Sequence, residues 1–293
     1  MYELIQVGTN SYYMDCPAKV GFYRISTKEV VLIDSGSDND AAKKVKRILD
    51  AQGWSLKAIF NTHSHADHIG GNQYLQNQTG CKIYAPGIEC AVTEYPILEP
   101  VMLYGGSVLK ELQNKFLMAK ESVAEKLSPE VLPQGLEVIL LPGHSYDMVG
   151  FRTADQVVYL ADCLSSAETL EKYQIGFLYD VQSYLDTLEM VKTLNADCYV
   201  PSHALQTCEI APLAQLNINK TIEIADKIRS YLSEPITFED LLAKVFDGYQ
   251  LTMNLQQRML IGSTVKSYLS YLKQKGQAEY LFENNRMLWK RVD

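Results

Sequence analysis

The 293-residue chain has the composition of an ordinary globular protein, with 47% hydrophobic and 21% charged residues. Its formal net charge of −8 disfavours nonspecific binding to polyanions over the whole surface. No apolar stretch approaches the ~18 residues of a membrane span, and the N-terminus does not read as a signal peptide. Six scattered cysteines without a C-x-x-C motif indicate free thiols, so we expect a cytoplasmic protein.

The first third of the chain alternates short buried strands with amphipathic helices. The β-branched run Val30–Ile33 predicts a strand that is buried on both faces and ends at Asp34. The apolar positions that follow predict a helix from about Asn39, which Gly53 ends. Further predicted elements are a strand at 58–60, a helix at 72–78 and a strand at 82–85.

The segment 136–203 predicts a second group of strands. We expect a strand at 136–141, a hairpin of 149–153 with 157–160, a helix from Asp180 to Leu194, and a strand at 198–200. Four strands of the chain thus end within a few residues of a histidine or aspartate. In sheets covered by helices, ligands gather beyond the carboxyl ends of strands, so these side chains should converge.

An insertion at residues 88–130 interrupts this pattern, and its part from Leu109 to Lys126 predicts a helix. A segment of this length next to the histidines is a candidate lid or pocket wall. The alternative is a flap that packs on the core or on a second subunit. We expect substrate identity to depend on this insertion and on Tyr146, Tyr173 and Tyr179.

All five histidines of the chain lie where a metal site needs them, together with two aspartates. The candidate ligands are His63, His65, Asp67, His68, His144, Asp162 and His203. Imidazole with carboxylate suits zinc, iron or manganese better than calcium or magnesium, which prefer oxygen ligands. We expect two metals that share a hydroxide, because two metals ~3.5–4 Å apart lower the pKa of bound water to near 7.

The H-x-H-x-D-H spacing divides these ligands between the two metals. His63 and His65, two residues apart, can point at one metal, which His144 would complete. Asp67 and His68 lie one step further on and would bind the other metal, with His203. Asp162 would bridge the two metals. Asp67 is also the candidate proton acceptor from the attacking water and donor to the leaving group.

These motifs, with Gly70-Gly71 behind the hexapeptide, resemble the metallo-β-lactamase superfamily, and the glyoxalase II-like hydrolases share the ligand set. The resemblance covers about residues 1–230. It implies an α/β fold (α+β in some schemes), a four-layer αβ/βα sandwich with the two-metal site at one edge of two facing sheets. Asp34 matches the position of a carboxylate that orients ligand histidines in this family, although it could also be a simple turn residue.

Differences from other branches of the superfamily narrow the range of activities that we expect. Secreted zinc β-lactamases generally carry a cysteine where Asp162 stands, and the adjacent Cys163 should point the other way. Flavodiiron members carry glutamate in place of His65, which disfavours that redox branch. Persulfide dioxygenases with a single iron remain a minor alternative.

Residues 234–293 read as a small winged-helix-like module after a catalytic domain at 1–233. Thr237 predicts a helix cap, further helices are expected near Asn254 and at 263–275, and a hairpin follows at 277–291. The module could contact nucleic acid, or it could mediate packing or dimerisation. Its net charge of +1 is small for a protein that binds a polyanion, so it favours packing or dimerisation. The basic side chains in question are Lys266, Lys273, Lys275, Arg286, Lys290 and Arg291.

Three functions follow from these patterns. The first is a cytoplasmic hydrolase with two metals, zinc before iron or manganese, in which the shared hydroxide attacks a small thioester, ester or lactone. The second is a metal-dependent ribonuclease that acts on single-stranded RNA with the help of the tail. The third is a nucleic-acid-binding regulator whose metals are structural. A homodimer is left open, and no membrane partner is expected.

Overall fold

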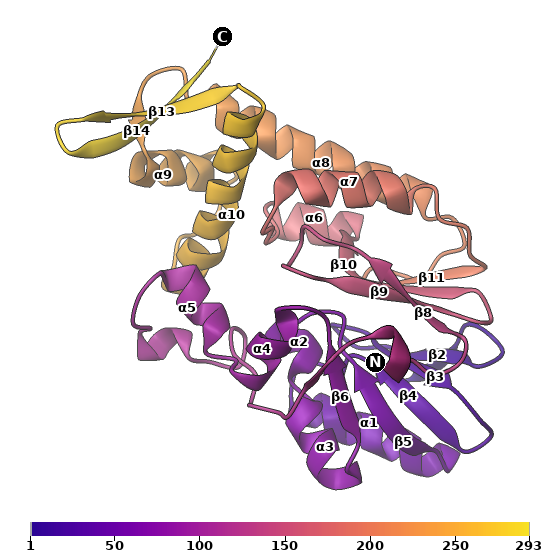
Figure 1. Cartoon of the computed structure of the whole chain (residues 1–293). Helices are drawn as coiled ribbons and strands as arrows, with labels where there is room; N and C mark the ends of the chain where they lie inside the picture. The colour runs from indigo at the N-terminus through magenta and orange to yellow at the C-terminus, as the bar shows by residue number, and fades with distance from the viewer. Residues whose placement is uncertain (1, 293) are drawn as a thin grey trace.

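A computed structural model describes residues 2–292 and shows two β-sheets stacked face to face, with helices covering both outer faces (Figure 1). The larger sheet has seven strands in the order β1-β2-β3-β4-β5-β6-β7, and the smaller has four in the order β11-β10-β9-β8. These four layers are the mixed α/β sandwich that the sequence predicted. Among the described residues, no helix is long and apolar enough to cross a membrane.

The larger sheet is antiparallel at its start and parallel from β4 onward. Its strands are β1 Leu4–Gln6, β2 Ser11–Met14, β3 Val20–Arg24, β4 Glu29–Ile33, β5 Ser55–Phe60, β6 Lys82–Ala85 and β7 Glu125–Lys126. Helices α1 (Asn39–Gln52) and α3 (Asn72–Thr79) cover its outer face (Figure 1). As predicted, α1 ends at Gly53, whose φ of 67° lies in the left-handed region.

The smaller sheet consists of β8 Leu136–Leu140, β9 Val149–Thr153, β10 Val157–Ser165 and β11 Cys198–His203. Helices α6 (Ala167–Tyr173), α7 (Val181–Val191) and α8 (Ala211–Ser230) lie over its outer face (Figure 1). Asp180 caps α7 as expected, accepting from the Ser183 amide, but the helix ends three residues before the predicted Leu194.

The core between the two sheets explains the continuous hydrophobic runs of the strands. Val31 and Ile33 of β4 pack toward Phe151 of β9 and Tyr159 of β10, whereas Val30 and Leu32 pack with the helices outside. The side chains of these four residues are at most 2% exposed. A strand with both faces buried is thereby confirmed for 30–33.

Two predicted strand ends are wrong in a way that matters for the site. Asp162 does not follow its strand, because β10 continues to Ser165. Its pairing with β11 shifts register on both sides of Ala161, whose φ is 49°. Such bulges redirect side chains at the rims of sheets, so Asp162 reaches the site from within a strand. His203 is likewise the last residue of β11, which runs past Val200.

The insertion at 88–130 contains helices α4 (Glu89–Glu94) and α5 (Leu98–Tyr104), but the helix predicted for Leu109–Lys126 is wrong. Only the single-turn 3₁₀ helices η1 (Lys110–Leu112) and, beyond this segment, η2 (Pro129–Val131) form. The backbone of Val123 bonds to the Gln76 side chain instead of to a helix, with distances of 2.8 and 3.1 Å. The segment then joins the sheet as β7.

The carboxyl-terminal residues form β12 (Ile236–Thr237), α9 (Phe238–Gly248), α10 (Leu255–Gln274) and the hairpin of β13 (Ala278–Glu283) with β14 (Arg286–Arg291). The cap at Thr237 and the hairpin are confirmed, but the two helices expected near Asn254 and at 263–275 are one continuous helix. In Figure 1, α10 descends from the hairpin to α5. The boundary at 233 and the winged-helix interpretation stay predictions.

Candidate metal centre

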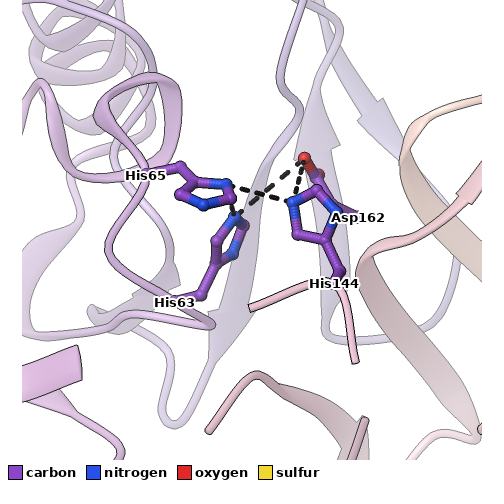
Figure 2. Close-up of side chains that lie close together, drawn as sticks. All are labelled: His63, His65, His144 and Asp162. Atoms are coloured by element: carbon purple, nitrogen blue, oxygen red, sulfur yellow. Dashed lines mark hydrogen bonds and ion pairs between the residues drawn. The ribbon is translucent and has the colours of Figure 1, made fainter. Parts of the chain in front are cut away.

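Four side chains from three separate segments form the first cluster (Figure 2). His63 and His65 come from the loop after β5, His144 from the loop after β8, and Asp162 from β10. His65 Nδ1 lies 3.0 Å from both His63 Nε2 and His144 Nε2. Asp162 Oδ2 lies 3.5 Å from His144 Nε2 and 4.0 Å from His63 Nε2. The predicted convergence of these four residues is therefore present in the fold.

The second cluster consists of Asp67, His68, Asp162 and His203, whose donor atoms all lie within 4.8 Å of one another. His68 Nε2 is 2.9 Å from Asp162 Oδ1, and His203 Nε2 is 3.1 Å from Asp162 Oδ2. Asp67 Oδ2 lies 3.4 Å from His203 Nε2. Asp162 belongs to both clusters, so its carboxylate stands between the two groups of donors.

Close backbone packing holds the hexapeptide in place. Residues Ala66–Ile69 form the single turn α2, and the chain continues through Gly70 and Gly71. A Cβ atom on Gly70 would lie 2.2 Å from the Ser37 carbonyl oxygen, and one on Gly71 would lie 2.3 Å from the Ser35 carbonyl oxygen. Only glycine permits this approach to the end of β4, so the Gly-Gly pair fixes the distance between α2 and the sheet.

The Asp34 side chain contacts His68, a histidine of the second cluster. Its side chain is 1% exposed, and its Oδ2 lies 2.8 Å from His68 Nδ1. The same carboxylate accepts from the Thr62 amide and hydroxyl at 2.8 Å, and that hydroxyl lies 3.0 Å from His63 Nδ1. One buried carboxylate thus contacts both His68 and the residue that precedes His63.

Glu89 is a buried site residue that sequence reasoning missed. Its carboxylate accepts from the Ser64 amide at 3.1 Å and the Asp147 amide at 3.2 Å. The hydroxyls of Ser64 and Ser145 also donate to it, one to each oxygen. Ser64 separates His63 from His65, and Ser145 follows His144, so this carboxylate ties together the two loops of the first cluster. Nothing local in the sequence distinguishes Glu89 from the neighbouring acids Glu94 and Glu99.

The charges of the two clusters differ in the metal-free protein. Burial lowers the pKa of His65 to about 4, and burial with the neighbouring His65 lowers that of His144 to about 3. These rings are neutral at pH 7 and offer a free lone pair. Burial opposes protonation of His203, but Asp162 and Asp67 outweigh it and raise its pKa to about 10. The same carboxylates raise the pKa of His68 well above its usual value.

The donor arrangement fits divalent metal ions. Neighbouring donors of a tetrahedral zinc with bonds of 2.0–2.1 Å lie about 3.4 Å apart, and the separations in the first cluster bracket that value. His68 Nε2 and Asp162 Oδ1 are buried, and neither has a hydrogen-bond partner of acceptable geometry within residues 2–292. Orphaned polar atoms facing each other inside a protein are costly, so a ligand between them is physically reasonable.

Aromatic side chains surround the first cluster. The ring centroid of Phe177 lies 5.3 Å from that of His65 and 6.0 Å from that of His144. Tyr146 and Tyr179 pack together at 4.5 Å and line the small pocket beside His65, as expected from the sequence. Tyr173 does not line that pocket, because it lies on α6 with half of its surface exposed.

Cys163 points away from the site, as expected for a neighbour of Asp162 on a strand. Its side chain is fully buried in the core under α7 and α8. All six cysteines are free, which confirms that expectation.

Curated relatives of this chain include several hydroxyacylglutathione hydrolases. That of Methylococcus capsulatus is 40% identical over 65 residues, which are 20% of this chain and 25% of that protein. That of Albidiferax ferrireducens is 25% identical over 234 residues, 77% of this chain and 79% of that protein. The chain therefore spans about a quarter of the first relative and about four fifths of the second.

Solved structures share the fold across the whole chain. A beta-lactamase domain protein from Burkholderia ambifaria has a TM-score of 0.74 at 14% identity, covering 99% of this chain and 94% of that one. A metallo-beta-lactamase family protein from Thermus thermophilus has a TM-score of 0.69 at 15% identity, covering 99% and 97%. The family model of the metallo-beta-lactamase superfamily matches residues 13–203. That span is well over half of the sequence, and with the two histidine-aspartate clusters at the edge of the facing sheets it shows that the chain belongs to the metallo-beta-lactamase superfamily.

Proposed function

We propose that this protein is a hydrolase of small thioesters, esters or lactones that holds two divalent metal ions, with zinc the best fit to its donors and iron or manganese able to occupy the same sites. The observation that carries the proposal is the pair of donor clusters that share Asp162. The name of the relatives, hydroxyacylglutathione hydrolase, supports a small-molecule substrate.

We assign His63, His65 and His144 to one metal and Asp67, His68 and His203 to the other, with Asp162 between them. Bound metals of this kind lower the pKa of water and polarise the carbonyl that the water attacks. Neutral rings at His65 and His144 suit the first metal. The protons on His68 and His203 must leave before these rings can bind a metal, and Asp34 then keeps His68 in one tautomer.

Asp67 is the proposed proton carrier of the reaction. In the metal-free protein, burial raises the pKa of its carboxyl, but His68 and His203 outweigh burial and lower it to about 2, so the carboxylate is ionised and available to bind a metal. Its side chain is 43% exposed, more than those of His63, His68, His144, Asp162 and His203. It therefore can reach both solvent and a substrate. The Phe177 ring packs against the rings of His65 and His144 and places an apolar surface beside them.

The test compares Asp162→Asn with Asp197→Asn, an exposed aspartate just before β11. Protein purified with zinc should contain two metals per chain by mass spectrometry and hydrolyse a panel of thioesters, esters and lactones. Chelation should abolish turnover, and zinc should restore it. Asp162→Asn should lose at least one metal and more than ~100-fold in kcat/KM, because it loses a shared anionic ligand. Turnover that survives chelation, or an Asp162→Asn variant with full metal content, contradicts the proposal.

A further inference from the structure

A pocket of about 140 Å³ opens beside the candidate metal centre, with His65 and Asp67 on one wall. Its other walls come from parts of the chain that are distant in sequence. The insertion contributes Leu103, Phe116 and Leu117, and α10 contributes Leu260. With Phe177, five of the eight lining side chains are apolar. A dry cavity of similar volume lined by such side chains is large enough to hold a benzene-sized ligand.

The walls of this pocket are built into the fold. Leu103, Leu112 and Leu117 of the insertion form a small hydrophobic cluster with Met259 of α10, and each is at most 7% exposed. Phe177 and Leu260 pack against this cluster.

Hydrogen bonds hold α10 against the loop that carries Phe177. The Thr264 hydroxyl accepts from the Leu178 amide at 3.2 Å, and the Ser267 hydroxyl donates to the Tyr179 carbonyl at 2.8 Å. The insertion and the tail therefore meet over the metal centre and leave a gap there.

The lining of the pocket contains acidic side chains. Asp67 and Glu99 line it, and no lysine or arginine does so. Lys115, beside Phe116, pairs instead with Asp38 at 3.1 Å. An anionic group at the far end of an acyl chain would find no lysine or arginine among the side chains that line this pocket and would face mainly apolar ones.

We propose that the pocket between the insertion and α10 binds the acyl group of the substrate and selects uncharged apolar acyl groups of about four to six carbons. This inference rests on the proposed function and specifies its substrate class. Figure 2 shows His144 turned toward Asp162 and His65 turned toward His63 and His144, and His65 is also one of the side chains that line the pocket. An acyl chain seated there extends from a carbonyl at the metal centre. Phe116, 69% exposed, provides apolar surface on the pocket wall.

The experiment uses the full-length zinc-loaded protein and p-nitrophenyl esters with acetyl, butanoyl, hexanoyl and decanoyl groups. Each buried methylene should raise kcat/KM by up to about fourfold until the pocket is full, so the values should peak at butanoyl or hexanoyl and fall at decanoyl. The succinyl half-ester, which matches butanoyl in carbon number but carries a charge, should be at least tenfold poorer than butanoyl.

Leu260→Trp fills the pocket and should lower the hexanoyl-to-acetyl ratio of kcat/KM at least tenfold. Leu103→Ala enlarges the pocket and should move the optimum to a longer chain. Leu255→Trp, on the exposed start of the same helix, is the control and should leave the ratio unchanged. Equal turnover of acetyl and hexanoyl esters by the wild type, or ratios that neither pocket variant alters, overturns the inference. Failure to hydrolyse any ester, thioester or lactone contradicts the proposed function instead.

Discussion

Replacing Glu89 with glutamine tests how strongly the first cluster depends on a residue outside it. The substitution keeps the size of the side chain but turns one carboxylate oxygen into an NH₂ group. Each oxygen of Glu89 accepts from one backbone amide and one serine hydroxyl. Whichever way the new amide is turned, the NH₂ group faces two donors. One serine can rotate its hydroxyl away, but the backbone amide of Ser64 or Asp147 cannot.

The magnitude follows from these contacts. Hydrogen bonds to a charged group contribute ~1.5–3 kcal/mol each, so the loss of two should cost about 3–6 kcal/mol in the free energy of unfolding. That is a large part of the ~5–15 kcal/mol by which typical domains are stable. At roughly 2–4 °C per kcal/mol for a chain of this size class, the melting temperature should fall by about 6–24 °C. The loops that carry His63, His65 and His144 should also lose their fixed spacing.

Thermal unfolding measures the loss of stability, and the zinc content after dialysis at fixed free zinc measures the loss of metal binding. Glu89→Gln should melt earlier and retain less zinc than the wild type, at a temperature where both proteins are folded. Glu94→Gln, at the other end of α4, is the matched control, since its side chain faces no comparable set of donors. A Glu89→Gln variant that melts and binds zinc like the wild type refutes the role assigned to this carboxylate.

Two further predictions concern the second cluster and the pH dependence of stability. Asp34→Asn places an NH₂ group opposite either the Thr62 amide or, on the other side, the Thr62 hydroxyl and His68 Nδ1. It should weaken zinc binding about 10–100-fold in a competition assay with a chromophoric chelator, and wild-type affinity would contradict the orienting role. In the metal-free protein, burial lowers the pKa values of His65 and His144 to about 4 and about 3, against ~6.5 when unfolded, so the unfolded chain binds these protons first. The stability that these rings contribute is complete above pH 6.5 and is lost as the pH falls through about 4 and then 3. The denaturant midpoint of the metal-free protein should therefore fall between pH 7 and pH 4. A midpoint that does not change over this range would show that the rings are not buried as the structure places them.

The candidate ligands were predictable because each carries its chemistry in its residue type and lies at or near the end of a buried strand. Runs such as Val30–Ile33 identify a strand with both faces covered, and such strands present their carboxyl ends to one edge of the sheet. Caps such as Asp180 and Thr237 also depend on contacts within three residues of sequence, so they were found.

The features that were missed depend on contacts between distant segments. The segment 109–126 has residues compatible with a helix, but Gln76 supplies hydrogen bonds to its backbone, and β6 pairs with its end. The bulge at Ala161 that redirects Asp162 forms only against β11. Glu89 differs from the neighbouring acids because Ser64 and Ser145, which are 25 and 56 residues away in sequence, donate hydrogen bonds to it. No local pattern encodes such contacts.

The structure also changes how the carboxyl-terminal residues should be interpreted. Four of the six basic side chains that could contact RNA have partners within the tail itself. Lys266, Lys273 and Lys275 lie over aromatic rings at 4.9–5.6 Å, and Lys290 pairs with Glu279 at 3.0 Å. The comparisons support neither an RNA partner nor a homodimer, and both stay predictions.

Helix α10, in contrast, shares a hydrophobic core with α7 and α8 and places Leu260 against the pocket. Deleting 234–293 would therefore expose the α8 face and remove a pocket wall, so loss of ester turnover in such a truncation follows from either interpretation of the tail. Point changes separate the two. Leu260→Trp alters the pocket and leaves every basic side chain in place, whereas Lys290→Gln changes the charge of the hairpin and leaves the pocket intact. An effect on acyl preference from the first and not the second would assign the tail to substrate selection.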